Sequence, residues 1–333
     1  MFWSEKSSEM EGAELCFPEL LNTSCSKTKH SPSDVLLLSI ILAFISFLTM
    51  ILNLLVIIAI MHFRQLHTST NVLIVSLAFS DFIMGFLLFF LVFKIDGCWY
   101  LGNIMCVLYV VLGFIVASSS VGNMVLISID RYVAICDPLH YPTKVTLKRT
   151  QVSVSVCWTC SLVYSTVILK DDLQQPGRFN SCVGLCTFDV GLTGLIVDLL
   201  LTFLLPVIVI IILYVTVFVV AVSQIRAMRS HVAAVSHQRS GKPKKSEIKA
   251  ARTLGVVIVV FLLCLCPYFC VSLLTEDSLF NSISGIYIIS LYYLNSCLNP
   301  LIYALFYPWF RKSVKIIVTL EILKSGSSNA NLL

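Results

Sequence analysis

Seven long apolar stretches dominate the chain and restrict the fold it can adopt. Each is long enough to cross the roughly 30 Å apolar core of a bilayer as a helix, which takes about 20 residues. They cover roughly residues 35–62, 70–94, 104–136, 151–169, 192–224, 253–273 and 283–307. Only 12% of the residues are charged, against roughly 25% in soluble domains. The sequence therefore predicts an all-α membrane protein, a seven-transmembrane helix bundle with neither a second domain nor a repeated half.

The distribution of Lys and Arg predicts the orientation of the bundle. Six of the 23 fall in segments assigned to the outside: Lys6, Lys27, Lys29, Lys94, Lys170 and Arg178. The other 17 lie at the opposite face, and such an excess marks the cytoplasmic side. We expect an extracellular tail over residues 1–34, the bundle over 35–307, and a cytoplasmic amphipathic helix and tail over 308–333, in a multi-pass protein of the plasma membrane. The net charge of +5 then reflects topology, and no nucleic-acid partner is expected.

Six of the 13 cysteines lie in segments assigned to the outside, where disulfides are permitted: Cys16, Cys25, Cys98, Cys106, Cys182 and Cys186. Spacing does not give their connectivity. We expect Cys106 to pair with Cys186, which would tie the third span to the second outer loop, and Cys25 to pair with Cys182. Asn22 begins an Asn-Thr-Ser triplet in the outer tail and is the expected glycan acceptor.

Two acids interrupt otherwise apolar spans. Asp81 lies deep in the second span, where a carboxylate needs a partner. Its candidate partners are polar residues of other spans: Asn53, Ser120, Asn295, Ser296 and Asn299. Either these groups bind a small cation such as sodium, or a protonated Asp81 joins a water-filled hydrogen-bond network. In the fifth span, Asp198 lies about two turns outward of Pro206, at a depth that could line an outward-open pocket; alternatively it snorkels to the headgroups, a role that suits Asp189 better.

The inner ends of the spans carry candidate switch residues. Asp130-Arg131-Tyr132 places an acid beside a base where the third apolar run ends. Glu247, at the inner end of the sixth span, is able to pair with Arg131 and so hold the two helices together. Pro267 is expected to kink the sixth span. No spacing of Cys and His typical of a metal site occurs, no phosphate-binding glycine loop is present, and no enzyme or organic cofactor is predicted.

Taken together, these residues resemble those of a rhodopsin-type G-protein-coupled receptor over residues 35–320. The shared marks are Asn53, Leu77 to Asp81, Trp99, Cys106, Asp130 to Tyr132, Trp158, Cys186, Pro206, Tyr214, Pro267, Asn299, Pro300 and Tyr303. Within that class, the motif from Asn295 to Tyr303, with Tyr307 and Trp309-Phe310, is similar to that of the trace amine-associated receptors. The resemblance favours the sodium site at Asp81, and it implies switch roles for Tyr214, Asn299, Pro300 and Tyr303.

The family resemblance implies a chemosensory, olfactory receptor for amines that signals through a stimulatory G protein to cyclic AMP. Many members hold the ligand ammonium with an aspartate where this chain has Gly113. This chain instead resembles fish-type members that carry an aspartate at the position of Asp198. The amine would then bind with its ammonium toward the fifth span and its tail toward the third. The expected ligand-binding residues are Asp198, Gly113, Phe114, Ala117, Thr202, Tyr268, Phe269, Ser272, Tyr293 and Asp189.

Other classes of protein fit less well. An odorant receptor shares the motif from Asp130 to Tyr141 but not the marks at Trp158 and Trp309. A light receptor needs a lysine in the seventh span, and none occurs between Thr275 and Phe310. A transporter would account for acids within the membrane, but inverted repeats are missing. Leu265 replaces a tryptophan that many relatives carry, which leaves a non-signalling decoy as an alternative.

Overall fold

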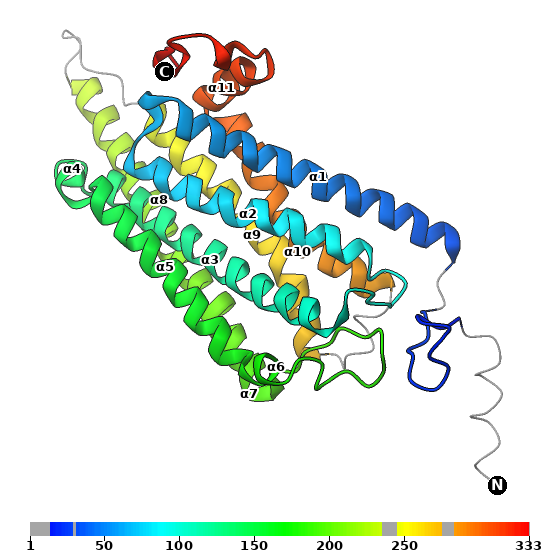
Figure 1. Cartoon of the computed structure of the whole chain (residues 1–333). Helices are drawn as coiled ribbons and strands as arrows, with labels where there is room; N and C mark the ends of the chain where they lie inside the picture. The colour runs from blue at the N-terminus through cyan, green and yellow to red at the C-terminus, as the bar shows by residue number, and fades with distance from the viewer. Residues whose placement is uncertain (1–13, 29–30, 235–244, 275–282, 333) are drawn as a thin grey trace.

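The computed structural model of the chain describes residues 14–28, 31–234, 245–274 and 283–332 (Figure 1). Seven spanning segments form the bundle. Six of them are single helices: α1 (Pro32–His62), α2 (Ser69–Val92), α3 (Gly102–Cys136), α5 (Leu147–Ile168), α9 (Lys245–Leu274) and α10 (Ile283–Phe306). The fifth span consists of three elements that follow one another without a break: α7 (Gly191–Asp198), η2 (Leu199–Leu204) and α8 (Leu205–Ala234). The shorter elements are η1 (Arg64–Leu66), α4 (Tyr141–Lys144), α6 (Lys170–Gln174), α11 (Pro308–Val318), η3 (Glu321–Leu323) and η4 (Ser327–Asn329). The predicted seven-helix bundle is confirmed.

The helices begin where local chemistry favours a start. Thr68 precedes α2 and its hydroxyl accepts a hydrogen bond from the N–H of Asn71 at 3.3 Å. Thr146 caps α5 in the same way. A side-chain oxygen at this position satisfies a backbone N–H that has no partner within the helix. Pro267 and Pro300 lie inside α9 and α10, as the sequence indicates.

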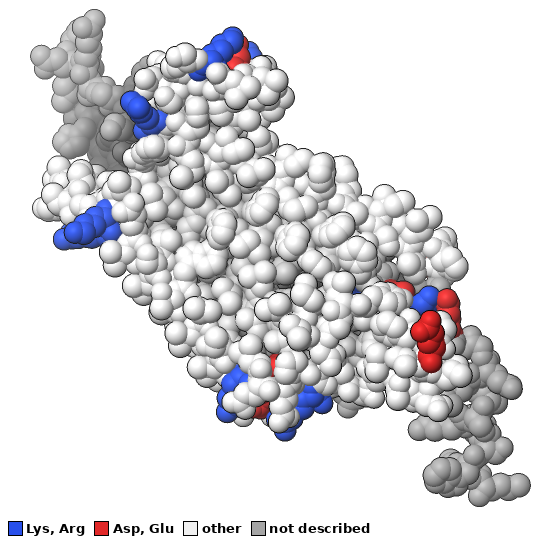
Figure 2. Space-filling model, in the orientation of Figure 1, with Lys and Arg blue, Asp and Glu red and all other residues white. Residues whose placement is uncertain are grey.

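The surface of the bundle is that of a protein solvated by lipid. Phe44, Leu263 and Leu305 are 65%, 66% and 71% exposed, whereas Asn53 and Asp81 are fully buried. Figure 2 shows charged side chains gathered toward the two ends of the molecule, with a broad uncharged band between them. Among the described residues, six helices are long and apolar enough to cross a membrane, and α9 contributes the shorter apolar stretch Val259–Ser272.

Helix α3 lies inside the bundle and connects its parts. It contacts α2, α5, α8, α9 and η2 (Figure 1). Residues on different faces of α3 can therefore meet the outer loop, the fifth span and the inner ends of the other helices.

Candidate functional site

The fifth span changes its winding directly after Asp198. Residues 199–204 form a π-helical segment, in which the N–H of Leu205 bonds to the carbonyl of Leu200, five residues earlier. Pro206 follows and has no N–H to donate, so the regular helical ladder is interrupted there. Wide turns of this kind often occur at functional sites. The local sequence thus explains a distortion beside the predicted ligand acid.

Asp198 is half-buried, and its two carboxylate oxygens differ in the hydrogen bonds that they accept. The hydroxyl of Tyr164, on α5, donates a hydrogen bond to Oδ1. The Thr202 hydroxyl also donates to Oδ1, at 3.2 Å, while bonding to the backbone carbonyl of Asp198 at 2.7 Å. Among the described residues, none donates a hydrogen bond to Oδ2. One oxygen is therefore held in place by the protein, and the other is available to a cation.

Aromatic side chains gather on the helices facing Asp198. The rings of Phe203 and Phe269 stack with their centres 4.6 Å apart. Tyr268 packs against Tyr292 with ring centres 4.9 Å apart. These rings join the fifth span to α9 and α10 beside the acid.

The predicted α3 wall has room beside Gly113. A Cβ built there would meet a single heavy atom within 4 Å, Cδ1 of Leu87 at 3.9 Å. The ring of Phe114 lies edge to face with Phe188 of the outer loop, with their centres 5.5 Å apart. Ala117 and Tyr293 both pack against a cluster formed by Met84, Leu87 and Val116. The structure therefore places these two predicted ligand residues at the same cluster and sets Phe188 of the loop against Phe114.

Two other predicted ligand residues are engaged locally. The Ser272 hydroxyl donates to the carbonyl of Tyr268 at 2.8 Å, within α9. Asp189 is exposed, and its Oδ1 accepts a hydrogen bond from the N–H of Gly191 at 2.7 Å. Within the described residues, no hydrogen bond links Asp189 to Asp198 or to the hydroxyls bonded to it. Its bond to the first residue of α7 resembles a helix cap.

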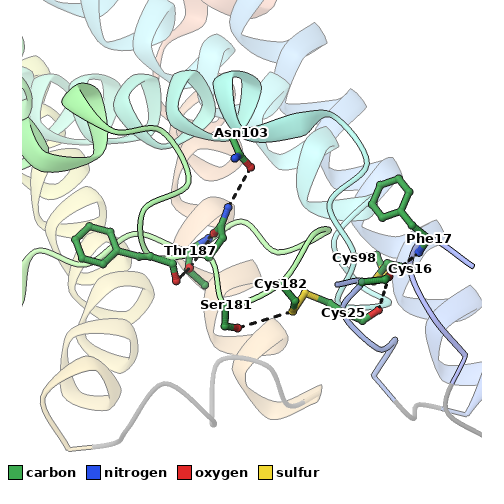
Figure 3. The surroundings of a disulfide bond; sticks show 11 residues. Cys16, Phe17, Cys25, Cys98, Asn103, Ser181, Cys182 and Thr187 are labelled. Carbon is green, nitrogen blue, oxygen red and sulfur yellow. Dashed lines mark hydrogen bonds between the residues drawn. A yellow bond between two sulfur atoms is a disulfide. The ribbon is translucent and has the colours of Figure 1, made fainter. Parts of the chain in front are cut away.

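The outer tail is fastened to the loops by disulfide bonds (Figure 3). The structure contains Cys106–Cys186 and Cys25–Cys182, the two expected pairings, and a third bond, Cys16–Cys98, that was not predicted. The N–H of Cys25 donates to the carbonyl of Val183 at 2.9 Å, and the N–H of Val183 donates to the carbonyl of Thr23 at 2.7 Å. The tail and the second outer loop thus form one covalently linked layer, and Asn22 lies exposed in a turn of it.

The acid of the second span lies in a polar core. Ser120 donates to Oδ1 of Asp81 at 3.3 Å, and the Asn299 amide donates to Oδ2 at 2.8 Å. Asn53 donates instead to the Ser296 carbonyl, at 3.0 Å. Several amide oxygens of the core have no hydrogen-bond partner in the described part of the chain: those of Asn53, Asn123, Asn295 and Asn299. Buried oxygens without donors fit water or a cation.

At the inner end, Asp130 and Arg131 form a closed network with α2 and α4. Arg131 bonds to Asp130 Oδ2 and to the Thr70 hydroxyl. Thr70 in turn donates to Asp130 Oδ2 at 2.9 Å, and Tyr141 donates to Oδ1 at 2.8 Å. The expected partner of Arg131 is Glu247, a residue of α9 whose side chain the structure does not describe.

The remaining switch candidates pack between helices. Tyr132 lies against a cluster that contains Val217 of α8. A Cβ at Gly255 would clash with the Tyr214 hydroxyl oxygen, so this glycine lets α9 approach the tyrosine. Tyr303 is buried at the inner end in a cluster with Trp309, Phe310 and Leu332. The tail after α11 folds back onto the inner end of α1 and η1, where the N–H of Leu332 donates to Oε1 of Gln65 at 3.2 Å.

The sequence is similar to known receptors along nearly its whole length. Residues 52–303 match the family "7 transmembrane receptor (rhodopsin family)". Trace amine-associated receptor 6 of Pan troglodytes is 38% identical, over 99% of this chain and 98% of that protein. Trace amine-associated receptor 13c of Danio rerio is 38% identical over 98% of each chain, and receptor 8a of Rattus norvegicus is 39% identical over 96% of each.

Proposed function

Because the chain belongs to the trace amine-associated receptors of the rhodopsin family, and is thus a multi-pass receptor of the plasma membrane and not an enzyme, we propose that it is a chemosensory receptor for amines. The ligand ammonium binds Asp198, and activation passes through a stimulatory G protein to cyclic AMP. The observation that carries this proposal is the Asp198 carboxylate, whose Oδ1 is held by two hydroxyls while Oδ2 has no donor among the described residues.

The amine lies with its ammonium toward the fifth span and its tail toward α3. A half-buried carboxylate without a cation is costly, and an entering ammonium offsets that cost. The tail would reach the space beside Gly113, where a side chain is missing. Burial of hydrocarbon contributes roughly 25 cal/mol per Å² of apolar surface. With one carboxylate at this level, monoamines are preferred over diamines.

A cyclic AMP reporter assay tests the proposal. Wild type, Asp198→Asn and Glu19→Gln are compared, at matched surface expression, on primary, secondary and tertiary monoamines and on diamines. Glu19→Gln is the control, because it neutralises an exposed acid of the outer tail that is not among the expected ligand-binding residues. We expect amine responses in wild type and the control, and their loss in Asp198→Asn. Equal potency in Asp198→Asn contradicts the counter-ion role, and responses to neutral odorants that survive the mutation favour an odorant receptor.

Sodium binding at Asp81 is a separate part of the proposal. Carboxylate, hydroxyl and amide oxygens suit a small hard cation, and Asp81 has Ser120 and Asn299 as direct partners while the Asn295 and Asn299 amide oxygens lack donors in the described part. Replacing sodium by N-methylglucamine should then raise amine potency in wild type and leave Asp81→Ala unchanged. The same response to the exchange in both proteins would argue against the site.

Coupling and glycosylation have independent tests. The Asp130-Arg131-Tyr132 motif at the inner end supports coupling to a heterotrimeric G protein, for which amine-stimulated nucleotide exchange on a stimulatory α subunit is the direct measurement. The exposure of Asn22 in an outer turn supports its role as a glycan acceptor. A mobility shift on glycosidase treatment should disappear in Asn22→Gln.

A further inference from the structure

Lys94 lies two residues beyond the outer end of α2, at the layer formed by the outer loops. Its ammonium donates a hydrogen bond to the carbonyl of Cys186 at 3.0 Å. Cys186 is disulfide-bonded to Cys106 in the first turns of α3. The lysine is therefore tied to the part of the second outer loop that is fastened over the helix predicted to carry the ligand tail.

The Lys94 ammonium has no counter-charge in the described part of the chain. None of the ion pairs found there includes it. The nearest acid in sequence, Asp96, accepts from the Cys98 N–H at 3.1 Å and from the Tyr100 hydroxyl at 3.0 Å. Burial lowers the pKa of Lys94 to about 8. An ammonium has three donors, so one neutral carbonyl leaves it capable of binding an anion.

The surroundings of Lys94 are continuous with the proposed ligand site. Cys186 belongs to an apolar cluster with Trp99, Cys106, Val110 and Leu169, against which Phe90, Tyr109 and Phe114 pack. Two residues after Cys186, Phe188 packs on Phe114, which adjoins Gly113.

A second connection runs through tyrosines. The hydroxyls of Tyr109 and Tyr293 are 3.3 Å apart. The rings of Tyr292 and Tyr293 have centres 5.7 Å apart, and Tyr292 packs on Tyr268. The neighbouring Phe269 stacks on Phe203 of the fifth span, five residues after Asp198. A wall of aromatic residues thus extends from the acid of the fifth span to the loop that holds the lysine.

We propose that Lys94 forms an anion-binding subsite at the outer end of the amine site, so that the receptor favours aminocarboxylates, which carry an ammonium and a distal carboxylate. This inference rests on the proposed function, because the ammonium is taken to bind Asp198. The ligand carboxylate pairs with Lys94, whereas the second ammonium of a diamine is repelled by it. One partly exposed ion pair changes affinity by roughly two- to fivefold.

The test measures ligand-induced thermal stabilisation of the purified full-length receptor in detergent. Matched ligands differ only at the distal end: pentylamine, cadaverine and δ-aminovalerate, and the corresponding butyl and hexyl series. The variants are Lys94→Met, which removes the charge, Lys94→Arg, which keeps it, and Lys170→Met as a control that removes an exposed outer lysine. Asp198→Asn is measured in parallel.

In wild type, Lys94→Arg and Lys170→Met, we expect the aminocarboxylate to bind better than the monoamine, and the monoamine better than the diamine, at one chain length or more. Lys94→Met should bind all three nearly equally. An unchanged ranking in Lys94→Met, or a wild type that never prefers the aminocarboxylate, overturns the subsite. Failure of the proposed function gives a different result. Monoamine binding would then be the same in wild type and Asp198→Asn, whatever the ranking of ligands in Lys94→Met.

Discussion

The hydrogen bond from Tyr164 to Asp198 makes a prediction that separates two ways of binding an amine. Tyr164→Phe removes the hydroxyl and keeps the ring. In the structure, Tyr164 and Thr202 both donate to Oδ1, and no donor in the described part reaches Oδ2. If the ammonium binds Oδ2, the tyrosine bond persists in the free and bound receptor, and Tyr164 acts as a positioning residue.

The size of the effect follows from that geometry. A hydrogen bond to a charged group contributes about 1.5–3 kcal/mol. Because this bond is present with and without ligand, binding loses only the part that comes from orientation of the carboxylate. We expect a loss of about 0.5–1 kcal/mol, a two- to fivefold rise in the half-maximal amine concentration. Asp198→Asn removes the charge itself, and losing one partner of a buried ion pair costs about 3–5 kcal/mol, or more than a hundredfold.

The assay is a monoamine dose–response in cyclic AMP with wild type, Tyr164→Phe, Thr202→Val and the double variant. Tyr287→Phe is the matched control, because that tyrosine is 55% exposed on the outer surface of α10. Two donors on one oxygen should couple, so the double variant should depart from additivity.

A lower half-maximal concentration in Tyr164→Phe would refute this reasoning. It would mean that the amine displaces the hydroxyl and takes Oδ1. A hundredfold loss, equal to that of Asp198→Asn, would also contradict the positioning role.

Three further predictions use other parts of the chain. Gly113→Asp has room for its Cβ, 3.9 Å from Leu87, and should improve responses to diamines relative to monoamines in the cyclic AMP assay; no relative gain would count against the proposed placement of the tail. Glu247→Ala should raise basal cyclic AMP at matched expression if it restrains Arg131, and an unchanged baseline would remove that restraint. Replacing Cys16 and Cys98 together by Ser should lower the melting temperature of the receptor, since loss of a native disulfide costs about 2–5 kcal/mol in small domains; an unchanged melting temperature would show that the two remaining disulfides suffice.

The spans were predictable because each depends on local composition. The helix starts at Thr68 and Thr146 and the interruption near Pro206 also have local causes. The π-helical form of residues 199–204 was not predicted. A proline shows that a helical hydrogen bond is missing, but not how the chain compensates for it.

Contacts between elements were harder to predict. Tyr164 was missed because it is one of several hydroxyl residues in its span, among them Ser161 and Ser165, and the sequence does not show which of them faces Asp198. The depth of Tyr164 in the span was the available signal. The Cys16–Cys98 disulfide was missed although Cys16 and Cys98 remained after the two expected pairs were assigned. Six cysteines allow 15 connectivities, and their spacing does not select one of them.

Three carboxylates on the spanning helices can be compared by the hydrogen bonds that their two oxygens accept. Asp81 has a donor on each oxygen, from Ser120 and Asn299. Asp130 also has both oxygens bonded, Oδ1 by Tyr141 and Oδ2 by Thr70 and Arg131.

Asp198 differs, because both of its described donors bind the same oxygen. Within the described part of the chain, the protein therefore supplies donors to both oxygens of the first two acids and to only one oxygen of the third. A carboxylate at outward depth with one bonded oxygen is held in place, and its second oxygen can accept a hydrogen bond from a ligand ammonium. This asymmetry, more than the presence of an acid in the membrane, favours Asp198 over Asp81 and Asp130 as the residue that binds an amine.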